Sequence, residues 1–288
     1  MLANNTFRRM KESLLSDEAN DAIELLRLRF AGFLDDVTPA DDVERQFANF
    51  LTSEGVLKKT TQTDYCMASP YVDGYIRTIV LPAKYLNSPT QSPPTQLNSD
   101  ALHVPEVVVE CLNYFDRSVV RLAPSRSFKS SLKLHVNGRS HVQVPRESVY
   151  DSELLRLLTN WFTRFGWTIS GQWHLRTQSG THQYTDIVLK KSGKAIVLEL
   201  LATGDKAFMR SHIDKTPGYK ALLSVVERWV IHFTCEDNST PLWQSDKLSD
   251  HVNVIHIAHD LGFTHLKMQT CWKNINNTTQ NDIYEIDL

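Results

Sequence analysis

The second half of the chain shows the clearest pattern, a helix followed by apolar strands. Residues 152–162 carry apolar side chains at helical spacing, and Gly166 follows them. The next elements are predicted in the order strand, strand, strand, helix, strand, strand: 167–176, 184–190, 195–202, about 206–228, 229–234 and 252–257, and the segment 263–272 closes the chain. This order of αβββαβ with a further strand predicts an α/β fold with a central mixed sheet.

The first 86 residues have a different pattern. Helical spacing predicts helices over residues 10–34 and 39–51, and the run 56–82 is typical of short strands around a turn. Helix, helix and strand pair together predict a small winged-helix-like module over residues 1–86. Modules of this shape bind DNA in some proteins and pack against protein in others.

A polar stretch separates the two patterns. Residues 87–104 are rich in Pro, Ser, Thr, Asn and Gln, a composition typical of a linker. The second domain is therefore expected over residues 105–288. Early in it, Asn137-Gly138 separates two alternating segments, which predicts a hairpin. The basic residues of this segment form a candidate phosphate-contact patch, although a solvated hairpin face explains them equally well: Arg126, Lys129, Lys133 and Arg139.

Two acidic residues stand inside adjacent apolar strands of the second domain, in the stretch YTDIVLKKSGKAIVLELL. Asp186 lies near the start of the first strand and Glu199 near the end of the second. Pairing about the short turn places the two carboxylates close together, where they repel each other. A divalent cation relieves this repulsion, and carboxylate and carbonyl oxygens suit Mg²⁺ or Mn²⁺. We therefore predict a Mg²⁺ (or Mn²⁺) site at Asp186 and Glu199, with the Leu200 carbonyl as a further ligand.

The predicted helix before these strands offers a third acid. Glu153 lies in its first turn and is expected to reach the same site. A metal-bound water can attack a phosphodiester, and the metal also stabilises the charge that develops. The helix dipole alone favours a glutamate at this position, which is the alternative interpretation.

These three acids on an αβββαβ scaffold resemble the PD-(D/E)xK, or restriction-endonuclease-like, nuclease superfamily. The resemblance implies that Glu153, Asp186 and Glu199 bind metal and that a lysine two residues after the second acid orients the water. Leu201 stands where that lysine is expected. Members of the superfamily can supply the lysine from the following helix, which makes Lys215 or Lys206 the candidate here. The resemblance thus implies a Mg²⁺-dependent endonuclease with a displaced lysine.

Longer blocks narrow the resemblance. The segments VPRESVYDSELLRLLTNWF, AIVLELLATG and SHIDKTPGYKALL are similar to the C-terminal region of fungal Crinkler-type effectors, over roughly residues 105–272. This resemblance implies a secreted effector that acts on DNA in the host nucleus, with a homodimer or a host nuclear protein as further partners. Residues 1–86 would then be the remnant of an ATPase lid or a helical, winged connector. The alternative is a catalytically inactive module of the same fold that binds DNA or a host protein.

Two histidines are candidates for the edge of the same cleft. His174 lies on the strand before Asp186, and His212 lies near Lys215. Both are expected to contact DNA in this interpretation, and a structural or surface role is the alternative for each.

The composition limits the possible functions but does not indicate a particular one. The formal net charge of -2 over 288 residues gives no overall attraction to nucleic acid, so any basic surface is local. The four cysteines are far apart and form no CxxC pair, which indicates buried thiols rather than a zinc site. No apolar run reaches membrane-spanning length, and the first residues lack a signal-peptide core. The sequence as written therefore predicts an intracellular protein with no membrane partner.

Overall fold

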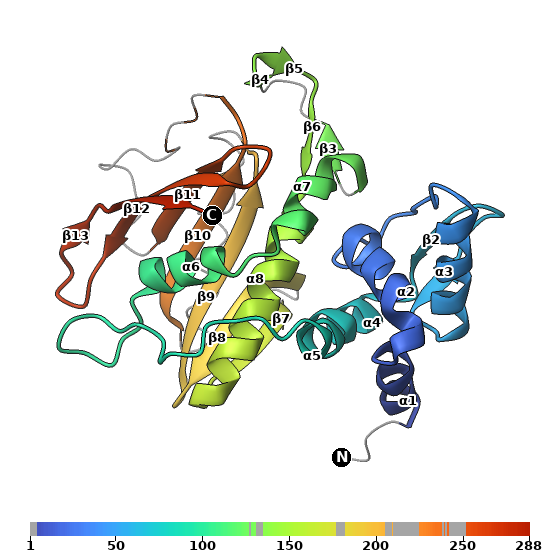
Figure 1. Cartoon of the computed structure of the whole chain (residues 1–288). Helices are drawn as coiled ribbons and strands as arrows, with labels where there is room; N and C mark the ends of the chain where they lie inside the picture. Colours follow the sequence, from blue (N-terminus) through green and yellow to red (C-terminus); the bar gives the residue numbers. More distant parts are fainter. Residues whose placement is uncertain are drawn as a thin grey trace. The chain divides into compact units, whose positions relative to one another are not determined.

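The chain divides into two compact units, Met1–Leu86 and Asn87–Leu288, in a computed structural model (Figure 1). The structure describes residues 5–126, 128–130, 135–176, 182–204, 209, 225–237, 239, 241 and 252–288. No helix in these ranges combines the length and apolar character needed to cross a membrane.

The first unit is mostly helical, with one small hairpin. Its elements are α1 (Asn5–Leu14), α2 (Asn20–Leu25), α3 (Asp42–Ser53), β1 (Leu57–Lys59), β2 (Tyr65–Met67), α4 (Pro70–Tyr75) and α5 (Leu81–Lys84). A π-helical stretch, Ile76–Val80, joins α4 to α5. The side chains of Phe30, Tyr65 and Ile76 are buried at the centre of the unit.

The caps explain where these helices begin. The Asp41 carboxylate accepts the Glu44 N–H at the start of α3, and Ser69 Oγ accepts the Val72 N–H at the start of α4. The strand pair β1–β2 confirms the predicted turn region. The prediction of further strand character up to residue 82 was wrong, because the Ser69 cap and Pro70 at the first helical position begin a helix there.

The second unit contains a mixed β-sheet. Its described strands lie in the order β13-β12-β11-β10-β9-β8-β7, and β14 also pairs with β12. Strands β9, β10 and β11 are parallel to one another, and the other pairs are antiparallel. The strand bounds are β7 (Thr168–Arg176), β8 (His182–Lys191), β9 (Lys194–Ala202), β10 (Val225–Thr234), β11 (Asn253–His259), β12 (His265–Lys273), β13 (Thr279–Gln280) and β14 (Ile283–Asp287). The predicted α/β class with a central mixed sheet is confirmed.

One boundary of the sheet differs from the prediction. The helix expected over residues 206–228 does not include its last four residues, because β10 begins at Val225. The segment VVERWVIHFT is rich in β-branched and aromatic residues, which favour a strand. Its pairing with both β9 and β11 buries most of it.

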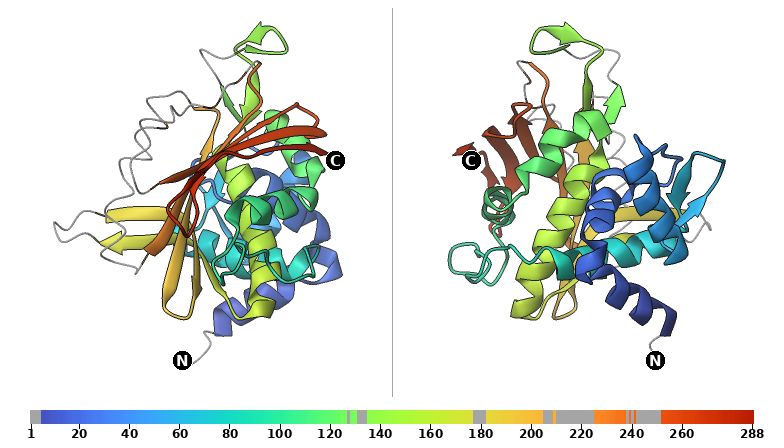
Figure 2. Two further views of the ribbon diagram at one scale, coloured as in Figure 1. Left: turned by 90° about the vertical axis from the view of Figure 1, so that its left-hand side faces the viewer. Right: turned by 45° about the vertical axis from the view of Figure 1, so that its right-hand side comes forward.

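Helices α6 (Val104–Asn113) and α8 (Glu147–Phe162) cover one face of the sheet (Figure 2), and α7 (Arg117–Arg126) connects them to a small hairpin region. The Tyr150 ring of α8 stacks on Phe233 of β10, with ring centroids 4.3 Å apart. Gly171 of β7 lies so close to α8 that a Cβ atom there would be 2.5 Å from Leu155 Cδ2. This close packing fixes α8 over the strands that carry the two acids.

The small hairpin region confirms the prediction at Asn137-Gly138. Strand β3 (Phe128–Ser130) pairs with β6 (Gln143–Pro145), and β4 (His135–Val136) pairs with β5 (Arg139–Ser140). Asn137 and Gly138 have φ angles of 51° and 71°, as a tight two-residue turn requires. The Asp237 carboxylate accepts both of their N–H groups, at 2.7 and 2.6 Å.

Residues 87–104, expected as a linker, are bound to the second unit. The Trp161 indole N–H donates to the Gln91 carbonyl at 2.6 Å, and Arg156 Nη1 donates to the Asn87 carbonyl at 2.8 Å. The Arg164 guanidinium donates to Ser88 Oγ at 3.0 Å. The segment is irregular in backbone, as its composition predicts, but it packs along α8 instead of spanning free space.

A candidate acidic site where two strands separate

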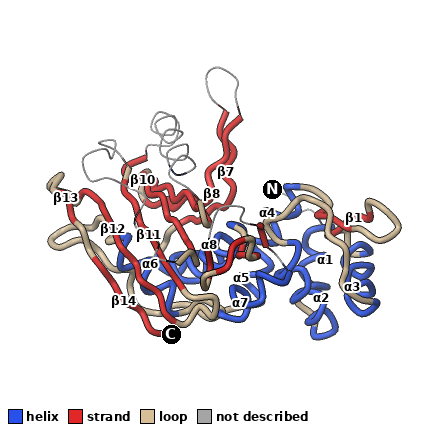
Figure 3. Tube along the Cα trace, turned by 90° about the horizontal axis from the view of Figure 1, so that it is seen from above, coloured by secondary structure: helices blue, strands red, loops and turns tan. Residues whose placement is uncertain are grey.

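Strands β8 and β9 separate at the two acids. Their ladder runs from the pair Lys191–Lys194 to the pair Ile187–Leu198, and one step further the register brings Asp186 opposite Glu199. From there β8 continues in pairing with β7 alone, out to residue 182 (Figure 3). Directly opposite residues of an antiparallel pair share one face of the sheet. The two acids therefore lie side by side where the strands part.

A backbone hydrogen bond fixes the Asp186 side chain. The Leu200 N–H donates to Asp186 Oδ2 at 2.7 Å, just beyond the end of the β8–β9 ladder. Asp186 is half-buried, and Glu199 is 4% exposed. The backbone of Leu200, predicted as a metal ligand through its carbonyl, thus lies beside Asp186. Its role as a ligand stays a prediction.

The surroundings of Asp186 are acidic. Burial raises its pKa well above the ordinary value, and the nearby charges of Glu199, Asp151 and Glu147 raise it further, in that order. The Leu200 N–H acts in the opposite direction but does not outweigh them. A carboxyl whose neighbours are carboxylates holds its proton more tightly, since its own ionisation adds a like charge.

Two of these neighbours come from α8 and were not predicted. Glu147 is the first residue of the helix and Asp151 lies four residues later, so they share one helix face. The N-terminal end of a helix dipole favours negative charge at both positions. The signal in the sequence was the spacing of two acids by four residues in ESVYD, which places both at the same end of α8.

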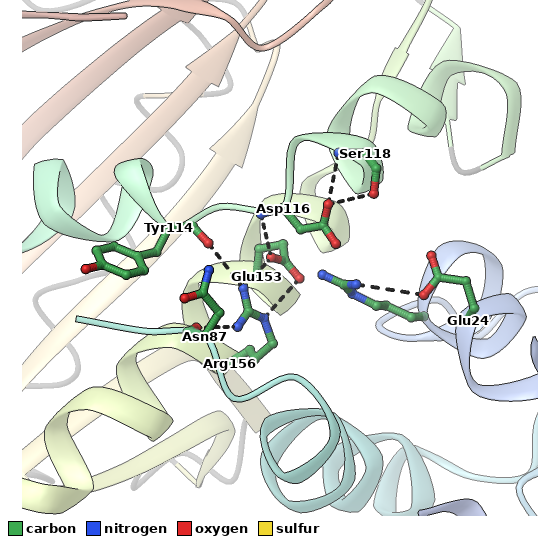
Figure 4. Close-up of polar contacts among 8 residues, drawn as sticks. Glu24, Asn87, Tyr114, Asp116, Ser118, Glu153 and Arg156 are labelled. Atoms are coloured by element: carbon green, nitrogen blue, oxygen red, sulfur yellow. Dashed lines mark hydrogen bonds and ion pairs between the residues drawn. The ribbon is translucent and has the colours of Figure 1, made fainter. Parts of the chain in front are cut away.

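Glu153, the predicted helix ligand, lies elsewhere. Residues two apart on a helix point about 200° apart, so Glu153 faces away from the side of Asp151. Its carboxylate accepts hydrogen bonds from Arg156 Nη2 at 2.8 Å and Nε at 3.3 Å, and from the Asp116 N–H at 3.2 Å. Figure 4 shows this group, with Arg156 donating onward to the carbonyls of Asn87 and Tyr114. Glu153 therefore joins α8 to neighbouring segments of its own unit.

The position of the missing lysine is apolar core. Leu201 is fully buried and packs with Met209, Val230, Val252 and Val254. On the adjacent strands His232 and His256 lie on the same face, with their Nδ1 atoms 3.1 Å apart. Burial lowers the pKa of His256 to about 4, so this residue is neutral at pH 7 and does not replace the lysine charge.

The remaining predicted residues are spread over the second unit. Arg126 ends α7, Lys129 lies in β3 opposite Val144, and Arg139 is exposed in β5. His174 lies in β7 opposite Tyr184. Four predicted residues lie outside the described residues: Lys133, Lys206, His212 and Lys215. The structure therefore places neither candidate lysine relative to the acids.

The donor chemistry of the two acids is that of a magnesium ligand pair. No group of three or more His, Cys, Asp or Glu side chains within the described ranges has the arrangement of a metal centre. Magnesium commonly binds through one or two carboxylates and keeps several of its waters. Asp186 and Glu199 supply such a pair, and a cation bound between them would reduce the repulsion of their carboxylates.

Comparisons of the chain with protein-family models, with curated proteins and with solved structures give no match.

Proposed function

We propose that the second unit is a metal-dependent phosphodiesterase of the restriction-endonuclease-like, PD-(D/E)xK type that acts on DNA. The observation that carries this proposal is the meeting of Asp186 and Glu199 where β8 leaves β9, with two further acids of α8 close enough to raise the pKa of Asp186. Acids collected at one point carry a free-energy cost, which a bound cation offsets.

In this proposal Asp186 and Glu199 hold the Mg²⁺ or Mn²⁺ ion. The bound ion supplies a Lewis acid that lowers the pKa of a water and stabilises charge on the phosphoryl group. The Leu200 N–H fixes the orientation of Asp186 before any ligand arrives. Asp151 and Glu147 take the place proposed by resemblance for Glu153, as acceptors for the waters that a magnesium ion retains.

The positive charge of the site is assigned to the segment after β9. We propose Lys215 or Lys206 for this role, because both follow the strand that carries Glu199. An ammonium group there stabilises the negative charge that develops on phosphate. The basic residues Arg126, Lys129, Lys133 and Arg139, with His174 and His212, are proposed to contact the DNA.

The family resemblance supports a wider proposal. The chain would be a fungal Crinkler-type effector that is secreted and reaches the host nucleus, and it would work there as a homodimer or with a host nuclear protein. The second candidate function is a catalytically inactive module of the same fold that binds DNA or a host protein. The burial of Leu201 among apolar side chains favours this second candidate, because an amine is absent from that position.

A plasmid-nicking assay with Mg²⁺ and with Mn²⁺ tests the leading proposal. We expect the wild-type protein to nick supercoiled DNA and Asp186→Asn and Glu199→Gln to lose that activity. Glu153→Gln, which alters a carboxyl outside the acid group, is the control and is expected to keep activity wherever it stays folded. Equal activity in all variants contradicts the proposal. Absence of nicking with retained DNA binding supports the inactive module instead.

A further inference from the structure

An open cavity lies at the other end of β9 from the acids. Its volume is about 1130 Å³, and it is bordered by the β8–β9 turn, the first residues of β10 and β11, the last residues of β12 and the segment 92–102. All of these belong to the second unit. Ile196, the residue of β9 in the cavity wall that is nearest to the acids, is three residues from Glu199, which is about 10 Å along a strand. The cavity is therefore separate from the acidic site.

The charged side chains around the cavity are mainly basic. Four basic residues line it against two acidic ones: Lys191, Lys194, Arg228 and Lys273 against Asp100 and Glu227. Lys191 and Lys194 stand directly opposite each other across the two-residue turn Ser192-Gly193, whose φ angles are 50° and 77°. Like charges held opposite one another are unfavourable, and an anion between them reverses that effect.

Aromatic rings form another part of the wall. Trp167 is half-buried and has Lys191 Nζ 5.6 Å from its ring centroid. Trp272 is buried, and its indole N–H donates to Asp282 Oδ2 at 2.8 Å, which fixes the ring. Aromatic walls with a few polar groups are typical of sites for organic ligands, and rings of this kind stack on planar bases.

We propose that this cavity binds a nucleotide phosphate, with the phosphate at the Lys191–Lys194 turn and the base against Trp167. The cavity has the size of a small-molecule site, and a mononucleotide combines the anion and the planar ring that the two parts of the wall recognise. The nucleotide is either free or part of a nucleic-acid strand. This inference does not rest on the proposed function, because it uses neither the acids nor a metal.

Calorimetric titration with adenosine 5′-monophosphate, without divalent cations, tests the inference. Adenosine and inorganic phosphate serve as separate arms, because each carries half of the recognised chemistry. The test variants are Lys191→Ala/Lys194→Ala and Trp167→Leu. The first unit offers a matched control, Lys58→Ala/Lys59→Ala, since both lysines are exposed and Lys59 Nζ is also 5.6 Å from an aromatic ring centroid, that of Tyr65.

We expect saturable binding of the monophosphate, tighter than that of adenosine or phosphate alone. The double-lysine variant should weaken it by about tenfold or more, and the tryptophan variant by a smaller factor. The control variant should bind like the wild type. Competition by a single-stranded oligonucleotide assigns the ligand to a strand, and its absence assigns it to a free nucleotide; both support the inference. No saturation up to about 1 mM, or unchanged binding in the double-lysine variant, overturns it.

Discussion

The side chains of Glu153 and Asp186 both carry a carboxyl group in the second unit, but the charges of their neighbours differ in sign. Glu153 is surrounded by donors, with the Arg156 guanidinium and the Asp116 N–H bound to its oxygens. Among the described residues, Asp186 accepts the Leu200 N–H and has three acidic neighbours; burial raises its pKa, and these neighbours raise it further. The first carboxyl has its opposite charge within the fold. The second is in a group of like charges, which folding alone does not favour.

This difference separates an acid that stabilises the fold from an acid that costs stability. Side chains arranged against their own stability are typical of functional sites, where a ligand supplies the missing charge. The comparison therefore distinguishes Asp186 and Glu199, the acids proposed to bind metal, from Glu153, whose carboxylate is bonded to other groups of the fold.

The largest effect is expected from Arg156→Ala. The side chains of Arg156 and Glu153 are at most 3% exposed, so the substitution leaves a buried carboxylate without its cation. We expect a loss of about 3–5 kcal/mol in the free energy of unfolding. Tryptophan fluorescence during urea denaturation measures it, because all six tryptophans lie in the second unit.

Arg164→Ala is the control for that substitution. Arg164 also donates to the segment after the first unit, at Ser88 Oγ and the Pro89 carbonyl, but it pairs with no acid in those bonds. A loss of about 1 kcal/mol is expected. Equal losses for the two arginines would show that the ion pair with Glu153 contributes no more to the free energy of unfolding than the hydrogen bonds of Arg164.

Asp186→Asn is expected to stabilise the protein at neutral pH in the absence of divalent cations. Because the folded-state pKa of Asp186 is raised, the folded protein binds more protons than the unfolded chain between the two pKa values. Wild-type stability therefore falls as pH rises from about 4 through the folded-state pKa, by about 1.4 kcal/mol for each unit of pKa difference. The variant should lack this loss. Urea denaturation at several pH values measures both, and a wild-type curve that rises with pH while the variant's is flat would contradict the account.

A smaller, ranked effect is expected from the neighbours of Asp186. Glu199 raises its pKa most, Asp151 less and Glu147 least. Glu199→Gln, Asp151→Asn and Glu147→Gln should therefore lower the pKa of Asp186 by amounts that decrease in that order. Carbon-detected NMR titration of the Asp186 carboxyl gives the three values. Glu153→Gln should leave this pKa unchanged, and a shift as large as that of Asp151→Asn would break the comparison.

The sequence predicted that Asp186 and Glu199 lie close together, but it did not predict that Glu147 and Asp151 are the acids of α8 near them. The turn Ser192-Gly193 and strict alternation were enough to bring Asp186 opposite Glu199. The departure of β8 toward β7 depends on tertiary packing and left no local signal. On α8, every residue from Val149 to Leu158 is buried, so no polar face marks which acid points toward the strands.

The segment 87–104 shows a similar limit. Its composition is that of a linker, and its backbone is irregular as expected. Its partners are Arg156, Trp161 and Arg164, which lie about 70 residues later in the chain. Contacts between residues so far apart in the chain depend on the fold. The composition of the segment therefore did not predict that it packs against α8.

Calorimetric titration with Mg²⁺ and Mn²⁺ measures metal binding by Asp186 and Glu199 without any need for DNA or catalysis. The account predicts that the wild-type protein and Glu153→Gln bind the ion with similar affinity, and that Asp186→Asn binds at least about tenfold more weakly, through loss of one carboxylate ligand. Binding that Asp186→Asn leaves unchanged, or no binding by the folded wild-type protein, would contradict it.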